Sequence, residues 1–336
     1  MELSTISQPD FTALAVVIFE KEKASLPQEM YTSGIFKVDT MPANQGNTRE
    51  YTEMSMEEYA DNKPEGAQAE RARVQQGYKK IMTSKRIAKD VGITYEMRTQ
   101  NKYPEVIGAL TSRPRLAINR RELDLTHRFT FCLSTTYTDK NGETVDIAMG
   151  DTFALGYTLH ALKASSTTYR NRLAGNPQFS KGSLENMLKM KVENTFNPWG
   201  EKVTSMPLDV IWSSEDPNTC NTIAEYLQST ASPDALNSGV VNVYRGKFRH
   251  VVLSRLATDA AGGVDSTKAK MWGVASTQGF DAHCGIWEEP RLKAPAPGNN
   301  QEDSSTDDWD FGVRAGYGIV ILSGVGFGVS DGLGTA

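Results

Sequence analysis

The chain has 336 residues, of which 39% are hydrophobic and 23% are charged, and its formal net charge at pH 7 is −5. These ordinary values exclude a disordered or collagen-like chain, and the length predicts more than one packed body. The acidic surplus argues against a protein that coats nucleic acid tightly, because such proteins carry excess Lys and Arg to neutralise phosphates.

Neither the cysteines nor the apolar segments indicate a secreted or membrane protein. Cys132, Cys220 and Cys284 are odd in number and widely spaced, so they predict neither a disulfide framework nor a structural zinc site. The apolar stretch at residues 11–19 is short and leads into charged residues without a cleavage site, which excludes a signal peptide. We expect a protein of a reducing cytoplasm that does not enter a membrane.

The N-terminal quarter of the chain predicts an arm followed by a ribbon. Residues 1–33 hold one apolar patch and too little hydrophobic content to fold alone, so they must lie on another surface. Residues 35–82 are polar, with strand-like ends around two turn-rich stretches, 41–48 and 61–66. Two long strands alone are marginally stable in water. We therefore expect a projecting ribbon that lies on a neighbouring surface, such as that of another subunit.

The middle of the chain predicts a long helix and a hairpin. Residues 94–131 have helical spacing interrupted by Pro104 and Pro114, which indicates a helix in pieces. Residues 137–147 predict a β-hairpin, because the Asn-Gly pair within them supplies the positive backbone angles of a tight turn. These two elements are the first, in chain order, of the predicted body of the protein.

The remaining residues predict an α+β arrangement. Ser183 is expected to cap one helix, and Asp216 with Pro217 to open another. Residues 294–306 indicate a flexible connector. Strands are expected at residues 208–212, 240–244, 248–253 and 271–275, with a final pair at 311–313 and 317–322.

No pattern indicates catalysis, a cofactor or a metal. The glycines between residues 312 and 328 lack the strand, Gly-x-Gly-x-x-Gly and helix order of a dinucleotide site, and we interpret them as permitting bends and close packing. Neither a nucleophile elbow nor a phosphate-binding loop occurs. The histidines lack metal-ligand spacing and are interpreted as structural, with a metal or thiolate site at His283 and Cys284 as a minor alternative. The histidines are His127, His160, His250 and His283.

The ribbon carries the residues that we expect to contact another subunit. Exposed tyrosines are good interface anchors because they combine a large ring with a polar hydroxyl, although local packing would explain them equally well. Basic groups near the ribbon are interleaved with acids, which favours solvated faces or subunit contacts over nucleic-acid binding. The predicted contact residues are Tyr51, Tyr59, Arg71, Arg73, Tyr78 and Lys79.

Four segments, taken in chain order, carry a family resemblance. They are Ser-Gly-Ile-Phe-Lys-Val at 33–38, the stretch Gly-Ala-Gln-Ala-Glu-Arg to Gly-Tyr at 66–78, Asn-Val-Tyr-Arg-Gly-Lys-Phe at 242–248 and Asp-Trp-Asp-Phe at 308–311. With them the chain resembles the major capsid (major head) proteins of tailed bacteriophages, most closely the Mu-like major head subunit group. The resemblance implies the Hong Kong 97-type phage capsid fold, an α+β fold.

That resemblance divides the chain into an N-terminal arm, an extended loop, a spine helix region, a peripheral domain, an axial domain and C-terminal strands that return to the peripheral domain. In this order the segments are residues 1–33, 34–92, 93–131, 132–205, 206–299 and 300–336.

The implied function is structural. Homo-hexamers and homo-pentamers would form an icosahedral head around packaged double-stranded DNA, which is enclosed without sequence specificity. A portal protein is an implied partner, the short arm implies a separate scaffolding protein or none, and decoration proteins are left open. The protein would assemble in the bacterial host cytoplasm and be located in the virion.

Two alternatives stay open at this point. An encapsulin-type nanocompartment shell resembles the same fold, but its subunits typically have a shorter loop than residues 35–82. A cytoplasmic α+β enzyme would require a pocket with convergent polar groups and shifted titrating residues.

Overall fold

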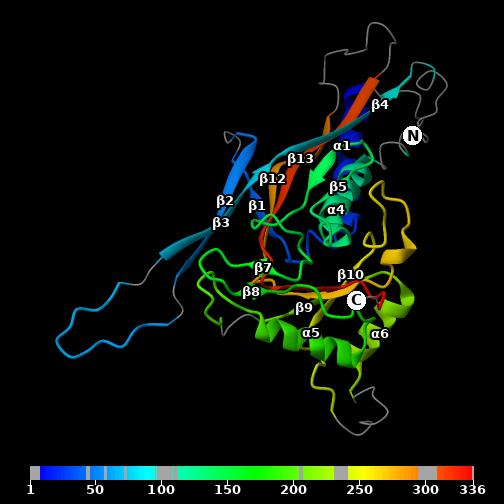
Figure 1. Ribbon diagram of the computed structural model, residues 1–336. Helices are drawn as coiled ribbons and strands as arrows, with labels where there is room; N and C mark the ends of the chain where they lie inside the picture. Colours follow the sequence, from blue (N-terminus) through cyan, green and yellow to red (C-terminus); the bar gives the residue numbers. More distant parts are fainter. Residues whose placement is uncertain are drawn as a thin grey trace.

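The computed structural model describes residues 8–42, 46–56, 59–71, 74–94, 96, 108, 113–203, 207–230, 241–293 and 309–334. Within these residues, two four-stranded sheets form an elongated body, and a two-stranded ribbon projects from its side (Figure 1). The predicted α+β class is therefore confirmed. No helix of the described part is long and apolar enough to cross a membrane.

The first sheet has the order β1-β12-β13-β4. β1 (Lys37–Thr40) pairs with β12 (Asp281–Lys293) in parallel, while β13 (Trp309–Ser323) runs antiparallel to both β12 and β4 (Lys85–Ile93). β13 is thus paired along both edges, so this long strand forms the axis of the upper half of the body (Figure 1).

Two helices cover this sheet. α4 (Arg113–Thr130) and α1 (Gln8–Ser25) meet β13 in a cluster of buried side chains that includes Phe19, Ala117 and Val313. The predicted arm therefore lies on its own chain. Pro114 falls in the first turn of α4, where an amide hydrogen would have no helical partner, and Pro104 lies outside the described residues.

The second sheet has the order β10-β9-β11-β14. Its strands are β9 (Val210–Ser214), β10 (Arg249–Leu253), β11 (Trp272–Ala275) and β14 (Phe327–Ser330). Two helices, α5 (Lys181–Glu193) and α6 (Pro217–Gln228), lie along one face of it (Figure 1). Leu184, Met187, Ile223 and Trp272 form the buried contact between these helices and the sheet. In this half of the body, two helices therefore pack on one face of a sheet.

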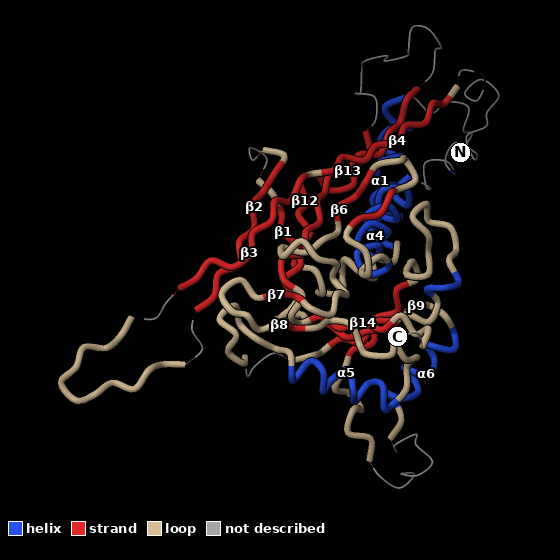
Figure 2. The backbone as a smooth tube through the Cα atoms, viewed as in Figure 1, coloured by secondary structure: helices blue, strands red, loops and turns tan. Residues whose placement is uncertain are grey.

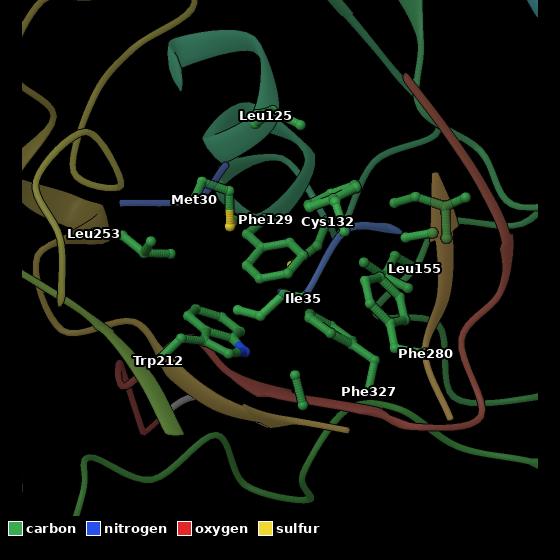
Figure 3. Close-up of a cluster of buried hydrophobic side chains, with 14 of the residues drawn as sticks. Met30, Ile35, Leu125, Phe129, Cys132, Leu155, Trp212, Leu253, Phe280 and Phe327 are labelled. Carbon is green, nitrogen blue, oxygen red and sulfur yellow. The ribbon is translucent and has the colours of Figure 1, made fainter. Parts of the chain in front are cut away.

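One aromatic core joins the two sheets (Figure 3). The ring of Phe129, near the end of α4, lies 5.0 Å from Trp212 on β9 and 4.9 Å from Phe327 on β14. Phe280 packs 5.4 Å from Phe327, just before β12 begins. Ring separations of 4.5–7 Å are favourable for aromatic pairs. The two halves of the body therefore share a single packed centre.

The segment after α1 is fixed to the body by two buried or half-buried carboxylates. The Glu122 carboxylate, on α4, accepts hydrogen bonds from the amides of Met30 at 2.8 Å and Tyr31 at 3.1 Å. Glu29 accepts one from the Ser254 amide at 2.9 Å. Burial raises the pKa of Glu122, whereas the two amide bonds lower it. This part of the predicted arm is therefore an integral part of the fold.

Three smaller pairs of strands complete the secondary structure, together with a short 3-10 helix at Ser266–Lys268. The pairs are β2 (Thr48–Met56) with β3 (Val74–Thr83), β5 (Thr136–Thr138) with β6 (Thr144–Asp146), and β7 (His160–Ala161) with β8 (Thr168–Tyr169).

Several local predictions are confirmed and others are wrong. The hairpin at 137–147 is present, with Gly142 at a φ of 80°, and Asp216 caps α6 as predicted. α5 is capped by Ser180, and Ser183 is instead the third helical residue, whose hydroxyl closes the capping box. Residues 243–247 form turns rather than a strand, because side-chain and main-chain bonds of Asn242 close the chain there.

The C-terminal strands also differ from the prediction. The expected pair at 311–313 and 317–322 is one continuous strand, β13, and the connector at 294–306 lies outside the described residues. β14 joins the sheet of β9, whereas β12 joins the sheet of β13, so the sheets do not follow the predicted segment boundaries. Strands pair with their neighbours in space, which sequence order alone does not reveal. The arm, loop and domain names remain predictions.

Lys191 is an unusual buried cation in α5. Its ammonium group donates to Asn171 Oδ1 at 2.6 Å and to the carbonyl oxygens of Arg170 and Val325, both at 3.2 Å. Within the described residues, no carboxylate lies within 4 Å of it. Burial lowers the pKa of Lys191 to about 7.

We predict that Lys191 makes stability depend on pH. The unfolded chain holds this proton up to a pKa of about 10.5 and the folded chain only up to about 7, so the free energy of unfolding rises with pH between these values. The slope approaches about 1.4 kcal/mol per pH unit. Urea denaturation between pH 7.5 and 9.5 should show a wild-type free energy of unfolding that rises with pH relative to that of Lys191→Met, a comparison in which the opposite contribution of the buried thiols cancels. Lys189→Met, whose side chain is 73% exposed, is the control and should behave like the wild type. Parallel pH profiles for all three proteins would contradict the prediction.

Candidate functional site

The ribbon of β2 and β3 is the most conspicuous projection of the molecule (Figure 2). Its register runs from Thr48 opposite Thr83 at the root to Met56 opposite Val74 at the outer end. A β-bulge between Thr52 and Met54 shifts the pairing by one residue. The ribbon is therefore a regular antiparallel pair that carries the loop between its strands away from the body.

The loop at the end of the ribbon is exposed throughout residues 59–71. Gly66 has a φ of 77°, and the Ala67 amide donates to the Pro64 carbonyl oxygen at 3.1 Å, which makes a tight turn with glycine at its third position. Tyr59 is 58% exposed and donates from its hydroxyl to the Lys202 carbonyl oxygen at 3.2 Å. The exposed residues 59–71 form no hydrophobic core of their own.

At its root, the inner face of the ribbon packs against β13. Tyr51 and Met82 are buried with Met41, Val320 and Leu322. The Met82 side chain reaches over Gly318, where a Cβ atom would lie only 2.8 Å from its Cγ. The glycines of β13 therefore allow close packing, as the sequence predicted, although this one is not at a bend.

A polar network fixes the same root. The Tyr51 hydroxyl donates to Asp39 Oδ2 at 2.6 Å, and its ring lies 4.2 Å from the His283 ring. His283 bridges Asp39 at 3.0 Å and Asp281 at 3.1 Å. Although burial raises it, hydrogen bonds from His283 and Lys37 hold the pKa of Asp281 at about 2. Asp281 therefore keeps its negative charge at any ordinary pH.

Further along, three polar contacts tie β3 to the body. Lys80 lies 2.9 Å from Asp146, and the Tyr78 hydroxyl donates to the Ala161 carbonyl oxygen at 3.2 Å. Lys163 donates to the Gly77 carbonyl oxygen at 2.9 Å. These contacts fix residues 77–80 of β3 relative to the body. The exposed loop lies beyond them.

The outer face of the ribbon is partly apolar. Ile81 and Val74 are each 58% exposed, and Met54 is 71% exposed. Lys79 and Glu50 lie 3.6 Å apart on the same face, both largely exposed. Exposed apolar side chains gathered on one projection are typical of an interaction surface.

The structure separates the predicted contact residues into two groups. Tyr51 is buried in its own chain and Tyr78 is half-buried against the body. Tyr59, Arg71 and Lys79 are exposed, and Arg73 lies outside the described residues. Their contact with another subunit stays a prediction. Sequence reasoning missed Ile81, Val74 and Met54, although alternation along β3 was a signal for Ile81, whose neighbour Met82 is buried on the opposite face.

The histidines and cysteines have structural surroundings. Burial lowers the pKa of His127 to about 4 and raises the pKa of Cys132 and of Cys284 to about 12, so these thiols stay protonated and unreactive. His160 lies 2.6 Å from Asp151 in the interior. His283 and Cys284 are neighbours on a strand and so point to opposite faces. Among the described residues, no group of three or more potential ligands could hold a metal ion.

Comparisons with known proteins identify the fold. No protein-family model and no curated protein matches the chain. A virus-like particle subunit from Pyrococcus furiosus matches with a TM-score of 0.50 and 11% identity over 95% of this chain and 98% of that chain. The capsid of cyanophage P-SCSP1u matches with a TM-score of 0.46 and 11% identity over 87% of this chain and 84% of that chain. The capsid of Myoviridae phage XM1 matches with a TM-score of 0.46 and 9% identity over 89% and 90%.

The first of these similarities covers nearly the whole of both chains and shows the architecture. The chain has the Hong Kong 97-type capsid fold, as the sequence predicted. The identity is too low to place it in a particular group of relatives, so the Mu-like grouping remains a prediction.

We predict that the Tyr51 hydroxyl stabilises the root of the ribbon. Tyr51→Phe keeps the ring on His283 but removes the hydrogen bond to Asp39, which should lower the free energy of unfolding by about 1 kcal/mol. Tyr59→Phe removes a hydrogen bond from an exposed tyrosine and should cost less than about 0.5 kcal/mol. Urea denaturation measures both values. Equal losses in the two variants would show that the Tyr51 bond does not anchor the ribbon.

Proposed function

We propose that this chain is the major capsid protein of a tailed bacteriophage, which assembles into hexamers and pentamers of an icosahedral head around double-stranded DNA. The observation that carries the proposal is the match to a virus-like particle subunit over 95% of the chain. A shell subunit acts by geometry, so it needs surfaces for its neighbours and no reaction centre.

The ribbon supplies such a surface. An isolated pair of strands is at best marginally stable in water, and the loop at residues 59–71 is exposed throughout, although the Tyr59 hydroxyl still donates to the Lys202 carbonyl oxygen. A loop that lies across the next subunit makes a head-to-tail contact, and such contacts close into rings when the rotation allows it. The ribbon would then add area to interfaces that bury roughly 1,600 Å² or more.

In this proposal the ribbon residues have two roles. Tyr59, Arg71 and Lys79, with the apolar Ile81 and Met54, contact the neighbouring subunit, because all five are exposed. The buried Tyr51 and half-buried Tyr78 instead set the angle at which the ribbon leaves the body.

The charge of the chain suits a container for DNA. A formal net charge of −5 supports enclosure of the genome without tight binding, because tight binding to phosphates requires excess cations. A portal protein and a separate scaffolding protein would be partners in assembly, and the assembled head would be the virion shell. Decoration proteins are not required by this scheme.

An encapsulin-type compartment is the second candidate, since the fold is compatible with it. The long ribbon favours the phage capsid. The two kinds of shell differ in what they contain, which is nucleic acid in a phage head and protein in a nanocompartment.

The first test is to express the chain alone and to examine it by size-exclusion chromatography with light scattering and by negative-stain electron microscopy. We expect closed shells, hexamers or pentamers. A variant in which residues 59–71 are replaced by a short Asn-Gly turn should keep the circular dichroism spectrum of the wild type but lose the assemblies. A wild-type protein that stays a compact monomer at every concentration would overturn the proposal.

A further inference from the structure

A cavity of about 300 Å³, lined by both polar and apolar residues, lies where the ribbon meets the body. Its walls come from β3 and β4, from α4, from the β5–β6 hairpin and from β13. The charged residues that line it are Lys80, Lys85, Asp124, Arg128, Glu143 and Asp146. Segments that are far apart in the sequence thus meet around one cavity.

Each acidic group of this cavity is engaged by a cation other than Arg128. Asp146 lies 2.9 Å from Lys80, and Glu143 lies 2.9 Å from Lys85. Asp124 lies 3.1 Å from Arg120. Asp124 also accepts a hydrogen bond from the Tyr317 hydroxyl at 2.6 Å. Asp139, behind the cavity wall, is shared by Arg120 at 3.0 Å and Lys85 at 3.1 Å.

Arg128 is the exception. The residue is only 9% exposed, and its Nη1 donates to the Asp146 carbonyl oxygen at 2.5 Å. Its Nε is buried and has no hydrogen-bond partner. Among the described residues, no carboxylate lies within 4.0 Å of the guanidinium. Burial lowers the pKa of Arg128, although nearby carboxylates partly offset this effect. Buried cations in folded proteins are normally paired, so this guanidinium lacks an anion.

We propose that the cavity binds a small oxyanion of the phosphate class, with the Arg128 guanidinium as its main ligand. A guanidinium presents parallel donors that match two oxygens of such an ion. Lys80 and Tyr137 line the same space, and an ammonium group and a phenol hydroxyl are further donors. Burial raises the pKa of Tyr137 to about 12, so this hydroxyl keeps its proton and can donate it.

The size of the cavity fits this ligand. One water takes roughly 30 Å³ in the liquid, so a space of about 300 Å³ holds a tetrahedral oxyanion together with several waters. The waters would separate the ion from Glu143 and Asp146, whose carboxylates repel it.

Binding at this place has a mechanical consequence. Lys80 belongs to β3 of the ribbon, whereas Arg128 belongs to α4 of the body. An anion held by both side chains would link the ribbon to the body through a second ionic contact, beside the Lys80–Asp146 pair at 2.9 Å. Occupancy should therefore stiffen the ribbon at its root.

Isothermal titration calorimetry of the full chain at pH 7.5, with sodium phosphate against sodium chloride of equal ionic strength, tests the proposal. We expect saturable phosphate binding to the wild type and at least about tenfold weaker binding to Arg128→Met, since a charge-assisted contact is lost. Arg86→Met removes an exposed arginine of β4 that does not line the cavity, and it should bind like the wild type. If Arg128→Met does not fold, Lys80→Met serves as the second variant and should also weaken binding.

The proposal is overturned if titrating phosphate into the wild type releases no more heat than titrating chloride. It is also overturned if the folded Arg128→Met variant binds phosphate as tightly as the wild type, or, where Arg128→Met does not fold, if Lys80→Met does. A second titration with a 12-base-pair DNA duplex separates the two sources of phosphate. Competition between duplex and phosphate assigns the site to the nucleic-acid backbone, whereas phosphate binding without competition assigns it to the free ion.

Discussion

The structure depends on the pairing of β13 along both of its edges. This strand takes β12 on one side and β4 on the other, and the chain then continues into β14 of the second sheet. The ribbon rests on the same strand, because Met82 packs over Gly318 without a side chain to keep it away. A substitution that adds a Cβ atom at residue 318 would meet Met82 at 2.8 Å and would lift the ribbon from the sheet. The position of the projecting loop therefore follows from backbone pairing in the body.

The interactions of the ribbon change along its length. Apolar packing and the Tyr51–Asp39–His283 network fix the root, single polar contacts fix the middle, and residues 59–71 are exposed. Such a gradient holds the ribbon at a defined angle and leaves its end available to another molecule. A shell of many identical subunits needs both properties, because a contact of the wrong angle does not close.

The sequence predicted elements whose cause is local, and it missed those whose cause lies elsewhere in the fold. The 137–147 hairpin and the Asp216 cap depend on a few neighbouring residues, and both were predicted correctly, although only Gly142 of the Asn-Gly pair has the expected positive φ. The burial of Tyr51 was missed because it depends on β13, which is more than 250 residues away in the chain. The missing hydrogen-bond partner of the Arg128 Nε is likewise a consequence of packing. The capsid fold itself was predicted from four short segments in the right order, which no single element would have indicated.

The loop of the ribbon is exposed in the free subunit, and in an assembly we expect a neighbouring subunit to cover it. Hydrogen–deuterium exchange of the residues 59–71 amides, measured by mass spectrometry on separated subunits and on assembled particles, tests this expectation. We predict fast exchange in the subunit and exchange slowed by about tenfold or more in the particle, because a loop laid on a neighbour loses contact with water. Equally fast exchange in both states would contradict this expectation and would assign the contact between subunits to another surface.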